Sequence, residues 1–113
     1  MTEKSELKIP RIIFHNTQEI RDYFNEDNLD ILIDIIDGIE QGYDMELNEV
    51  DIFEVEIATS NSVLLFILKE KEWVHELKEI LRRVIEVEKY ELADRISKLI
   101  KNVELRMEQK KNV

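Results

Sequence analysis

The sequence predicts an α+β domain: a small three-stranded, largely antiparallel sheet with two N-terminal helices and a C-terminal antiparallel helical hairpin. Three observations support this fold class. Apolar residues recur at helical spacing around 27–41 and again from 70 to 108. Residues 49–58 instead alternate between apolar and acidic, which is typical of a half-buried strand. The chain contains 2 Gly and 1 Pro, so regular structure should dominate.

The chain length of 113 residues is that of a single domain. Within 1–113 we expect a loose leader at 1–7, an acidic α+β body at 8–69, a helical hairpin at 70–108 and a frayed tail at 109–113. Cysteine is absent, which rules out a disulfide and fits a reducing, cytoplasmic compartment. The polar start of the chain predicts no signal peptide. No apolar run approaches the roughly 20 residues of a membrane span, so no membrane partner is expected.

The body should begin with a strand at Ile9–Phe14, followed by a short helix at 17–24. Asn16 and Glu19 have the spacing of a capping box, which marks the start of that helix. A longer helix is expected next, over 27–41, because its apolar residues fall on one stripe. That stripe is formed by Leu29, Leu32, Ile33, Ile36 and Ile39.

The same helix should carry a row of carboxylates on its other side. Asp27, Asp30, Asp34 and Asp37 are spaced by three, four and three residues, and therefore share a helical face. Gly42 follows at the place where a C-cap glycine belongs, so we expect the helix to end there. Because Asp is a poor helix former, packing against the rest of the domain must stabilise this helix.

Two further strands are expected, joined as a hairpin by the turn cluster 59–62. In the first strand, over 49–58, Glu54 and Glu56 alternate with apolar residues. The second, Val63–Leu68, is apolar on both faces and is therefore expected to be the central strand. The N-terminal strand would complete the sheet, because an isolated hairpin is only marginally stable.

The remaining residues, from Glu70 onward, follow helical periodicity in two separate apolar stripes. One continuous helix over 70–108 would extend about 58 Å and could not bury both stripes against a small sheet. We therefore expect a bend near Val87–Tyr90 and an antiparallel helical pair, although no Gly or Pro marks the bend.

The net charge of −10 is unevenly distributed. Residues 1–60 hold 4 Lys/Arg and 16 Asp/Glu, whereas residues 61–113 hold 12 and 10. Between Arg21 and Lys69 lie 47 residues with 13 acids and no Lys or Arg. Such a surface would repel nucleic acid and attract a basic protein, unless it is simply a solvated face.

Residue patterns typical of catalytic or metal sites are missing from the sequence. His15 and His75 stand alone without a surrounding motif, and zinc sites usually need four Cys or His ligands. No calcium-binding loop, nucleophile motif or Gly-rich phosphate cradle is present. In the last helix the cations are interrupted by acids, which argues against direct nucleic-acid binding. We expect no enzyme activity, no catalytic residues, no cofactor and no metal.

The segment 77–104 resembles the UVR motif, the helical hairpin of UvrB- and UvrC-type repair proteins. The motif's basic–acidic elbow and aromatic residue match Glu88-Lys89-Tyr90-Glu91, and its aliphatic side matches Ala93, Ile96 and Ile100. Asp94 stands where the family has a small residue, and Ser97-Lys98 replaces its Arg-Asp pair. The resemblance covers about a quarter of the chain. It implies a hairpin that pairs with a second copy, in the same protein or in another.

The leading hypothesis is therefore a non-enzymatic interaction module or adaptor that docks on another protein, or on a second copy as a homodimer, through its C-terminal hairpin. The expected contact residues are Trp73, Tyr90, Ala93, Ile96 and Ile100. The alternative is an acidic inhibitor, of the immunity, anti-restriction or DNA-mimic type, which binds a basic protein through its acidic face. Its contact residues would be Asp27, Asp30, Asp34, Asp37, Glu54 and Glu56. A structural subunit of a larger assembly is a further alternative, since such a role requires no motif.

Overall fold

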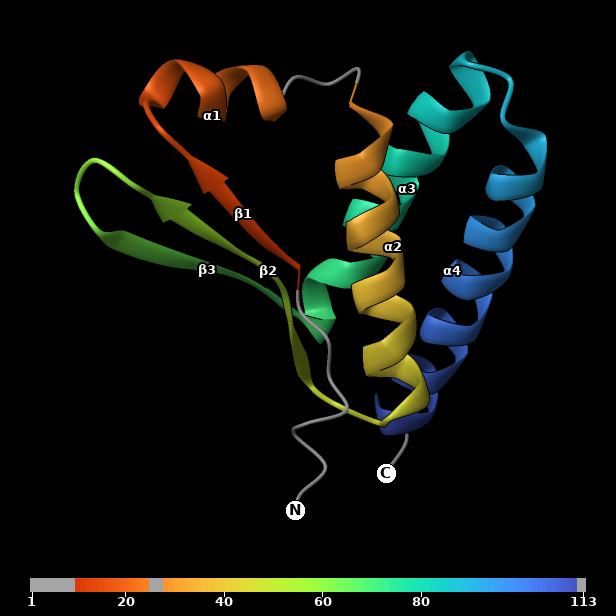
Figure 1. Ribbon diagram of the computed structural model, residues 1–113. Coiled ribbons are helices and arrows are strands. Elements are labelled where there is room, and N and C mark those ends of the chain that lie inside the picture. The colour runs from red at the N-terminus through yellow and green to blue at the C-terminus, as the bar shows by residue number, and fades with distance from the viewer. Residues whose placement is uncertain (1–9, 25–27, 112–113) are drawn as a thin grey trace.

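The computed structural model describes residues 10–24 and 28–111, which form an α+β fold with a three-stranded sheet on one side and helices on the other (Figure 1). This confirms the predicted α+β class. In chain order the elements are β1 (Arg11–Phe14), α1 (Thr17–Tyr23), α2 (Leu29–Asp44), β2 (Glu49–Ile57), β3 (Ser62–Lys69), α3 (Glu70–Glu86) and α4 (Tyr90–Lys111).

The sheet is mixed, and the prediction of a largely antiparallel sheet was wrong. Its strand order is β1-β2-β3, with β1 parallel to β2 and β2 antiparallel to β3. The reason is the connection between the first two strands. The 16-residue helix α2 returns the chain to the end of the sheet where β1 began, so β2 must run in the same direction as β1 (Figure 1). The short helix α1 lies across the opposite end.

The strand at the centre of the sheet is β2, and β3 lies at an edge. The expectation that Val63–Leu68 would form the central strand was therefore wrong. The centre is instead filled by β2, whose Val50, Ile52, Phe53 and Val55 are buried. A register shift between Asp51 and Phe53 lets the consecutive residues Ile52 and Phe53 both face the helices.

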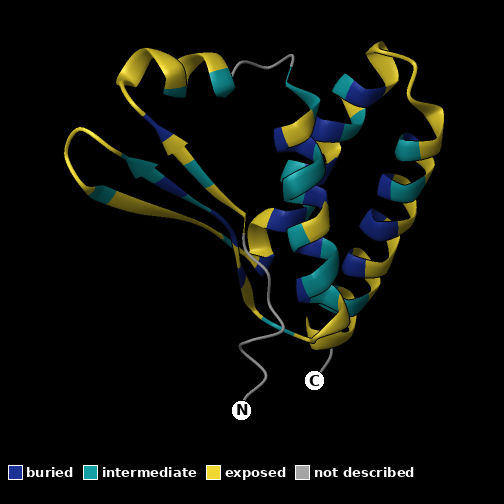
Figure 2. Cartoon of the chain, viewed as in Figure 1, coloured by how far each residue is buried: buried dark blue, intermediate teal, exposed yellow. Residues whose placement is uncertain are grey.

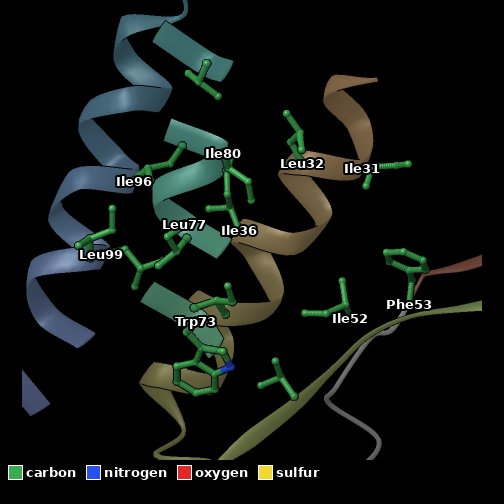
Figure 3. Close-up of a cluster of buried hydrophobic side chains, with 14 of the residues drawn as sticks. Ile31, Leu32, Ile36, Ile52, Phe53, Trp73, Leu77, Ile80, Ile96 and Leu99 are labelled. Carbon is green, nitrogen blue, oxygen red and sulfur yellow. The ribbon is translucent and has the colours of Figure 1, made fainter. Parts of the chain in front are cut away.

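The hydrophobic core lies between β2 and the helices α2, α3 and α4. Figure 3 shows Ile96 and Leu99 of α4 directed toward Leu77 and Ile80 of α3, with α2 completing the cluster. Gly42 permits a close approach of α2 to β2 and α3, because a Cβ at that position would overlap Val50 and lie 3.1 Å from the Trp73 ring.

The helices α2 and α3 end in the same C-terminal capping motif, in which a glutamate occupies the position where glycine is usual. At the end of α2, Leu47 N–H bonds to Gly42 O at 2.9 Å and Glu46 has φ 57°. At the end of α3, Lys89 N–H bonds to Val84 O at 3.1 Å and Glu88 has φ 60°. These are Schellman caps with a non-glycine residue in the left-handed region.

The two caps explain how the observed helix ends compare with the predicted ones. The predicted bend is confirmed, since α3 ends at Glu86 and α4 begins at Tyr90. The assignment of Gly42 as the cap of α2 was wrong, because Gly42 is a buried residue inside the helix. The expected frayed tail is helical up to Lys111, while 112–113 lie outside the described residues.

A buried ionic cluster connects the end of α4 to the start of α3. Glu70 accepts hydrogen bonds from Arg106 Nε at 3.0 Å and from Lys110 Nζ at 2.7 Å. Arg106 also donates to the carbonyls of Tyr43 and Leu47 at 3.0 and 2.9 Å, and its guanidinium lies over the Tyr43 ring. One arginine thus closes the C-terminal end of α2 and holds α3 and α4 together.

Candidate functional site

The most unusual surface of the protein is strand β3. Five consecutive large apolar residues, Val63–Ile67, have 37% to 52% of their surface exposed. Figure 2 shows this strand as an almost continuous exposed ribbon, in contrast to the neighbouring β2. Edge strands normally carry charges or prolines that block association, and Val63–Ile67 contains neither. We refer to Val63–Ile67 as the exposed edge segment.

The exposed edge segment is apolar on both faces of the sheet. Residues paired across an antiparallel ladder share a face. Phe66 pairs with the buried Phe53 and so faces the helices, as does Leu64. Leu65 pairs with Glu54 and so lies on the opposite face. We call this second face the open face; its β3 residues are Val63, Leu65 and Ile67.

The backbone of the exposed edge segment offers free hydrogen-bonding groups. In an antiparallel ladder each residue directs both its N–H and its C=O either toward the partner strand or away from it. Glu54 donates its N–H to Pro10 on the β1 side at 2.9 Å, so its partner Leu65 faces outward from β2. By alternation, Val63 and Ile67 face outward too. Among the described residues, no strand pairs with this outer edge.

The free edge ends at Lys69. The N–H of Glu70 bonds to Asn48 at 2.7 Å, which places the backbone of Lys69 on the outer side. There the Lys69 N–H is taken by the Glu72 carboxylate at 2.9 Å as part of a capping box that starts α3. The available donors are therefore those of Val63, Leu65 and Ile67.

An aromatic cluster supports the helix-facing side of β3. The Phe66 ring lies 4.6 Å from that of Phe53 and 5.2 Å from that of Phe24, measured between ring centroids. Beside it, a groove runs along the strand where β3 meets α2 and α3. It is lined by Ile35, Ile52, Leu65, Phe66, Ile67, Leu68 and Glu76. The helix-facing side of β3 is thus supported by packing, while its outer edge has no paired strand among the described residues.

The hairpin residues expected to bind a partner are mostly used inside the protein itself. Trp73, Ala93, Ile96 and Ile100 are buried, so they are not accessible to a partner. Figure 3 shows Trp73 and Ile96 in the core between the helices. Burial follows from the presence of α2, which covers the apolar side of the hairpin. Of the predicted set, Tyr90 alone is accessible, with 63% of its surface exposed.

Tyr90 lines a second groove. The groove is formed where the α3–α4 turn approaches the start of α2, and Leu29, Asp30, Ile33 and residues 88–92 line it. The elbow sequence Glu88-Lys89-Tyr90-Glu91 spans the end of the turn and the first residues of α4. The segment that resembles the UVR motif is therefore a helical hairpin with its elbow at the surface.

The acidic residues of α2 are partly neutralised by a cation from a distant part of the sequence. Arg95 of α4 donates to Asp37 at 2.6 Å and to Glu40 at 2.7 Å. These bonds hold the pKa of Arg95 above its usual value. Asp30 is exposed and Asp34 is half-buried. Burial, followed by the charges of Asp37 and Asp30, raises the pKa of Asp34. Asp27 lies outside the described residues.

Glu54 and Glu56 do not join the acids of α2. They lie on the open face of the sheet, whereas α2 packs on the other face. Arg11 of β1 contacts both carboxylates at 3.3 Å. A stretch without cations in the sequence thus receives them in space from β1 and α4. The predicted acidic residues do not form one continuous face.

Metal binding and membrane insertion find no support in the described part of the chain. There, no group of three or more His, Asp, Glu or Cys side chains could hold a metal ion. None of the helices within 10–24 and 28–111 is long and apolar enough to cross a membrane.

Comparison with protein-family models, with curated proteins and with solved structures finds no match to this chain. The UVR resemblance therefore stays a prediction from the elbow residues.

We did not predict from the sequence that the exposed edge segment would be exposed, although its apolar residues on both faces were a signal. An apolar strand is buried on both faces only if layers cover both sides of the sheet. In this structure the long helices cover one face of the sheet and leave the other open (Figure 1). A strand apolar on both faces therefore had to leave one set of side chains exposed.

Proposed function

We propose that this protein is a non-enzymatic protein-interaction module that docks through the exposed edge segment of β3. The partner would contribute an extended, uncharged apolar strand that pairs with the outer edge of β3 and extends the sheet. This mode of recognition uses main-chain hydrogen bonds for affinity and alternate side chains for specificity. The observation that carries the proposal is the run of five exposed apolar residues on an open strand edge.

The exposed surface is large enough to matter energetically. Fully burying a Val, Leu, Ile or Phe side chain stabilises by about 1.5–3 kcal/mol, so covering the exposed part of each gains roughly 1 kcal/mol. Five such residues would contribute about 5 kcal/mol from one side alone. Losses of rotational and translational freedom, of the order of 4–15 kcal/mol, offset the combined gain from both sides. We therefore expect weak and reversible binding.

The C-terminal hairpin acts in this proposal mainly as a support, since its apolar residues fill the core that holds β2 and β3 in place. Tyr90 and the elbow groove are a second surface for contact. The acidic-inhibitor alternative has weaker support, because Arg95 and Arg11 already bind Asp37, Glu54 and Glu56. A subunit of a larger assembly could use the same strand pairing.

The test is partner capture with a double substitution in β3. Leu65→Lys with Ile67→Lys places charge on the open face at two exposed positions, where the fold should tolerate it. Leu105→Lys is the matched control, because Leu105 is an exposed leucine on α4. A partner captured from source cells by the wild type and by the control, then identified by mass spectrometry, should be lost with the double variant.

Amide hydrogen exchange on the purified complex would locate the contact. The N–H groups of Val63, Leu65 and Ile67 should gain protection on binding, because they become part of a new ladder. Equal capture by the double variant and the wild type, or protection confined to α4, would disprove docking through β3.

A further inference from the structure

We propose that the strand which covers the exposed edge segment is β3 of a second copy of this chain. Two copies would join in an antiparallel manner about a two-fold axis that passes midway between their Leu65 residues, forming a continuous six-stranded sheet. This inference rests on the proposed function, since it names the occupant of the same strand edge. Three observations support it: the outward direction of the backbone groups of β3, the apolar side chains on both of its faces, and the point at which its unpaired edge ends.

The symmetry fixes which residues can face each other. A two-fold axis that relates adjacent antiparallel strands of one sheet is normal to that sheet, so the open faces of both copies lie on the same side. Residues of the open face must therefore pair with residues of the open face. Val63, Leu65 and Ile67 belong to that face and direct their backbone groups outward, so both requirements select the same three residues.

The end of the free edge selects the register. The Lys69 N–H is occupied by Glu72, so the available donors are centred on Leu65. With the axis between the two Leu65 residues, Leu65 pairs with its own equivalent and Val63 pairs with Ile67 of the second copy. All three outward-facing residues then form hydrogen-bonded pairs, about six bonds in total at two per pair. A register shifted toward Lys69 would compete with the cap of α3.

The side chains are complementary to themselves in this register. On the open face Val63 meets Ile67 of the second copy and Leu65 meets Leu65. On the helix-facing side Leu64 meets Phe66 of the second copy. Each exposed apolar residue would thus be covered by another exposed apolar residue, and residues 62–68 contain no charge that could oppose its equivalent. A heterologous partner would need this apolar pattern by coincidence, whereas a second copy supplies it by identity.

The absence of cysteine in the chain permits a direct test of the register. In the proposed dimer the two Leu65 Cα atoms would lie about 5.5 Å apart, within the range of a disulfide. Leu65→Cys should form a covalent dimer on mild oxidation or with a short bis-maleimide. Ile67→Cys alone should not, because its equivalent would be offset by four residues, about 13 Å along the strand. A mixture of Val63→Cys and Ile67→Cys chains should give the mixed dimer.

Light scattering provides the parallel measurement on the unmodified protein. The wild type and Leu105→Lys should show a dimer whose population rises with concentration, and Leu65→Lys should shift the dissociation constant at least tenfold toward the monomer. Circular dichroism verifies that Leu65→Lys folds. If it does not fold, the cysteine pairs decide the question.

Three outcomes would overturn the inference. They are a wild type that stays monomeric at millimolar concentration, a dimer that persists unchanged in folded Leu65→Lys, and cross-linking of Ile67→Cys as efficient as that of Leu65→Cys. A monomeric wild type that still captures a different protein through β3 would remove the second copy and leave the proposed function standing. A wild type that neither dimerises nor captures a partner through β3 would remove both.

Discussion

Arg106 of α4 binds the carboxylate of Glu70, the first residue of α3, from Nε at 3.0 Å and from Nη2 at 2.9 Å. Both side chains are largely buried, at 16% and 11% exposed. Removing Arg106 leaves the buried carboxylate of Glu70 with Lys110 as its one remaining cationic partner among the described residues. We expect Arg106→Met to lower the free energy of unfolding by about 3 kcal/mol, measured by urea denaturation. Lys98→Met, at an exposed i,i+4 pair with Asp94, is the control and should change it by less than about 0.5 kcal/mol.

The same cluster predicts sensitivity to acid. Burial acts to raise the pKa of Glu70, but hydrogen bonds from Lys110 and Arg106 outweigh it, so the pKa lies below the usual 4.5. Because the folded pKa is depressed, the stabilisation is present above pH 4.5 and is lost as the pH falls through the folded value. In Glu70→Gln this part of the acid-induced loss should disappear. An unchanged slope of stability against pH below 4.5 would contradict the assignment.

Asp34 should behave in the opposite sense. Its raised pKa means that the charged form is disfavoured in the fold, first by burial and then by Asp37 and Asp30. Asp34→Asn should therefore stabilise the protein at pH 7, and the gain should vanish as the pH falls below 3.8, where the unfolded carboxylate is protonated as well. Asp44→Asn, at an exposed residue on the same helix, serves as the control. Thermal melts at several pH values measure the effect.

The two glycines of α2 should respond differently to alanine. Alanine favours a helix by about 1 kcal/mol in each case. At Gly42 the added Cβ would overlap Val50 and press on the rigid Trp73 ring, so we expect a net loss of about 2 kcal/mol. At Gly38 the obstacle is the flexible end of Ile52, with its Cδ1 at 2.6 Å, and the net change should be near zero. Equal stabilities of the two variants would show that the α2–β2 contact can relax.

Glu88 offers a stabilising substitution. A non-glycine residue in the left-handed region costs about 1–2 kcal/mol, and a glycine in this position of the Schellman cap would avoid that cost. Glu88→Gly should therefore raise stability by roughly 1 kcal/mol, despite the greater freedom of glycine in the unfolded chain. Glu91→Gly, inside the helical part of α4, should lower it by a similar amount. A melting temperature that falls in both variants would argue against the cap.

The proposed dimer should depend on salt in an unusual direction. Each chain carries a net charge of −10, so two copies repel each other at low ionic strength. Raising the salt concentration screens that repulsion and should strengthen dimerisation, whereas binding of a basic partner would weaken. Sedimentation velocity at about 50 and about 500 mM salt distinguishes the two. Weaker self-association at high salt would contradict an apolar strand interface.

The elements of this fold followed from periodicity, because helical stripes and strand alternation are local properties of the sequence. The bend within 70–108 was also predictable, since one straight helix could not bury both apolar stripes against a small sheet. The strand order and directions were not predictable, because they depend on the end of the sheet to which α2 returns the chain. The helix ends were obscured by Glu46 and Glu88, which occupy cap positions where a glycine would have been the visible signal.

The candidate site was the least predictable part. Apolarity on both faces was visible at Val63–Leu68, but whether a strand is central or at an edge depends on β1, a segment far earlier in the chain. The ion pairs were equally unpredictable, because they join residues far apart in the sequence. Arg95 and Arg11 come from opposite ends of the sequence to bind Asp37, Glu54 and Glu56, so charge counted along the chain did not describe charge on the surface.

The junction between β3 and α3 has an optical consequence. No residue separates the two elements, and the indole N–H of Trp73 donates to the carbonyl of Leu68 at 3.1 Å. Trp73 is the single tryptophan of the chain and is fully enclosed. The strand edge is therefore connected to one natural fluorophore, whose emission wavelength and lifetime report a change in the strand without any added label.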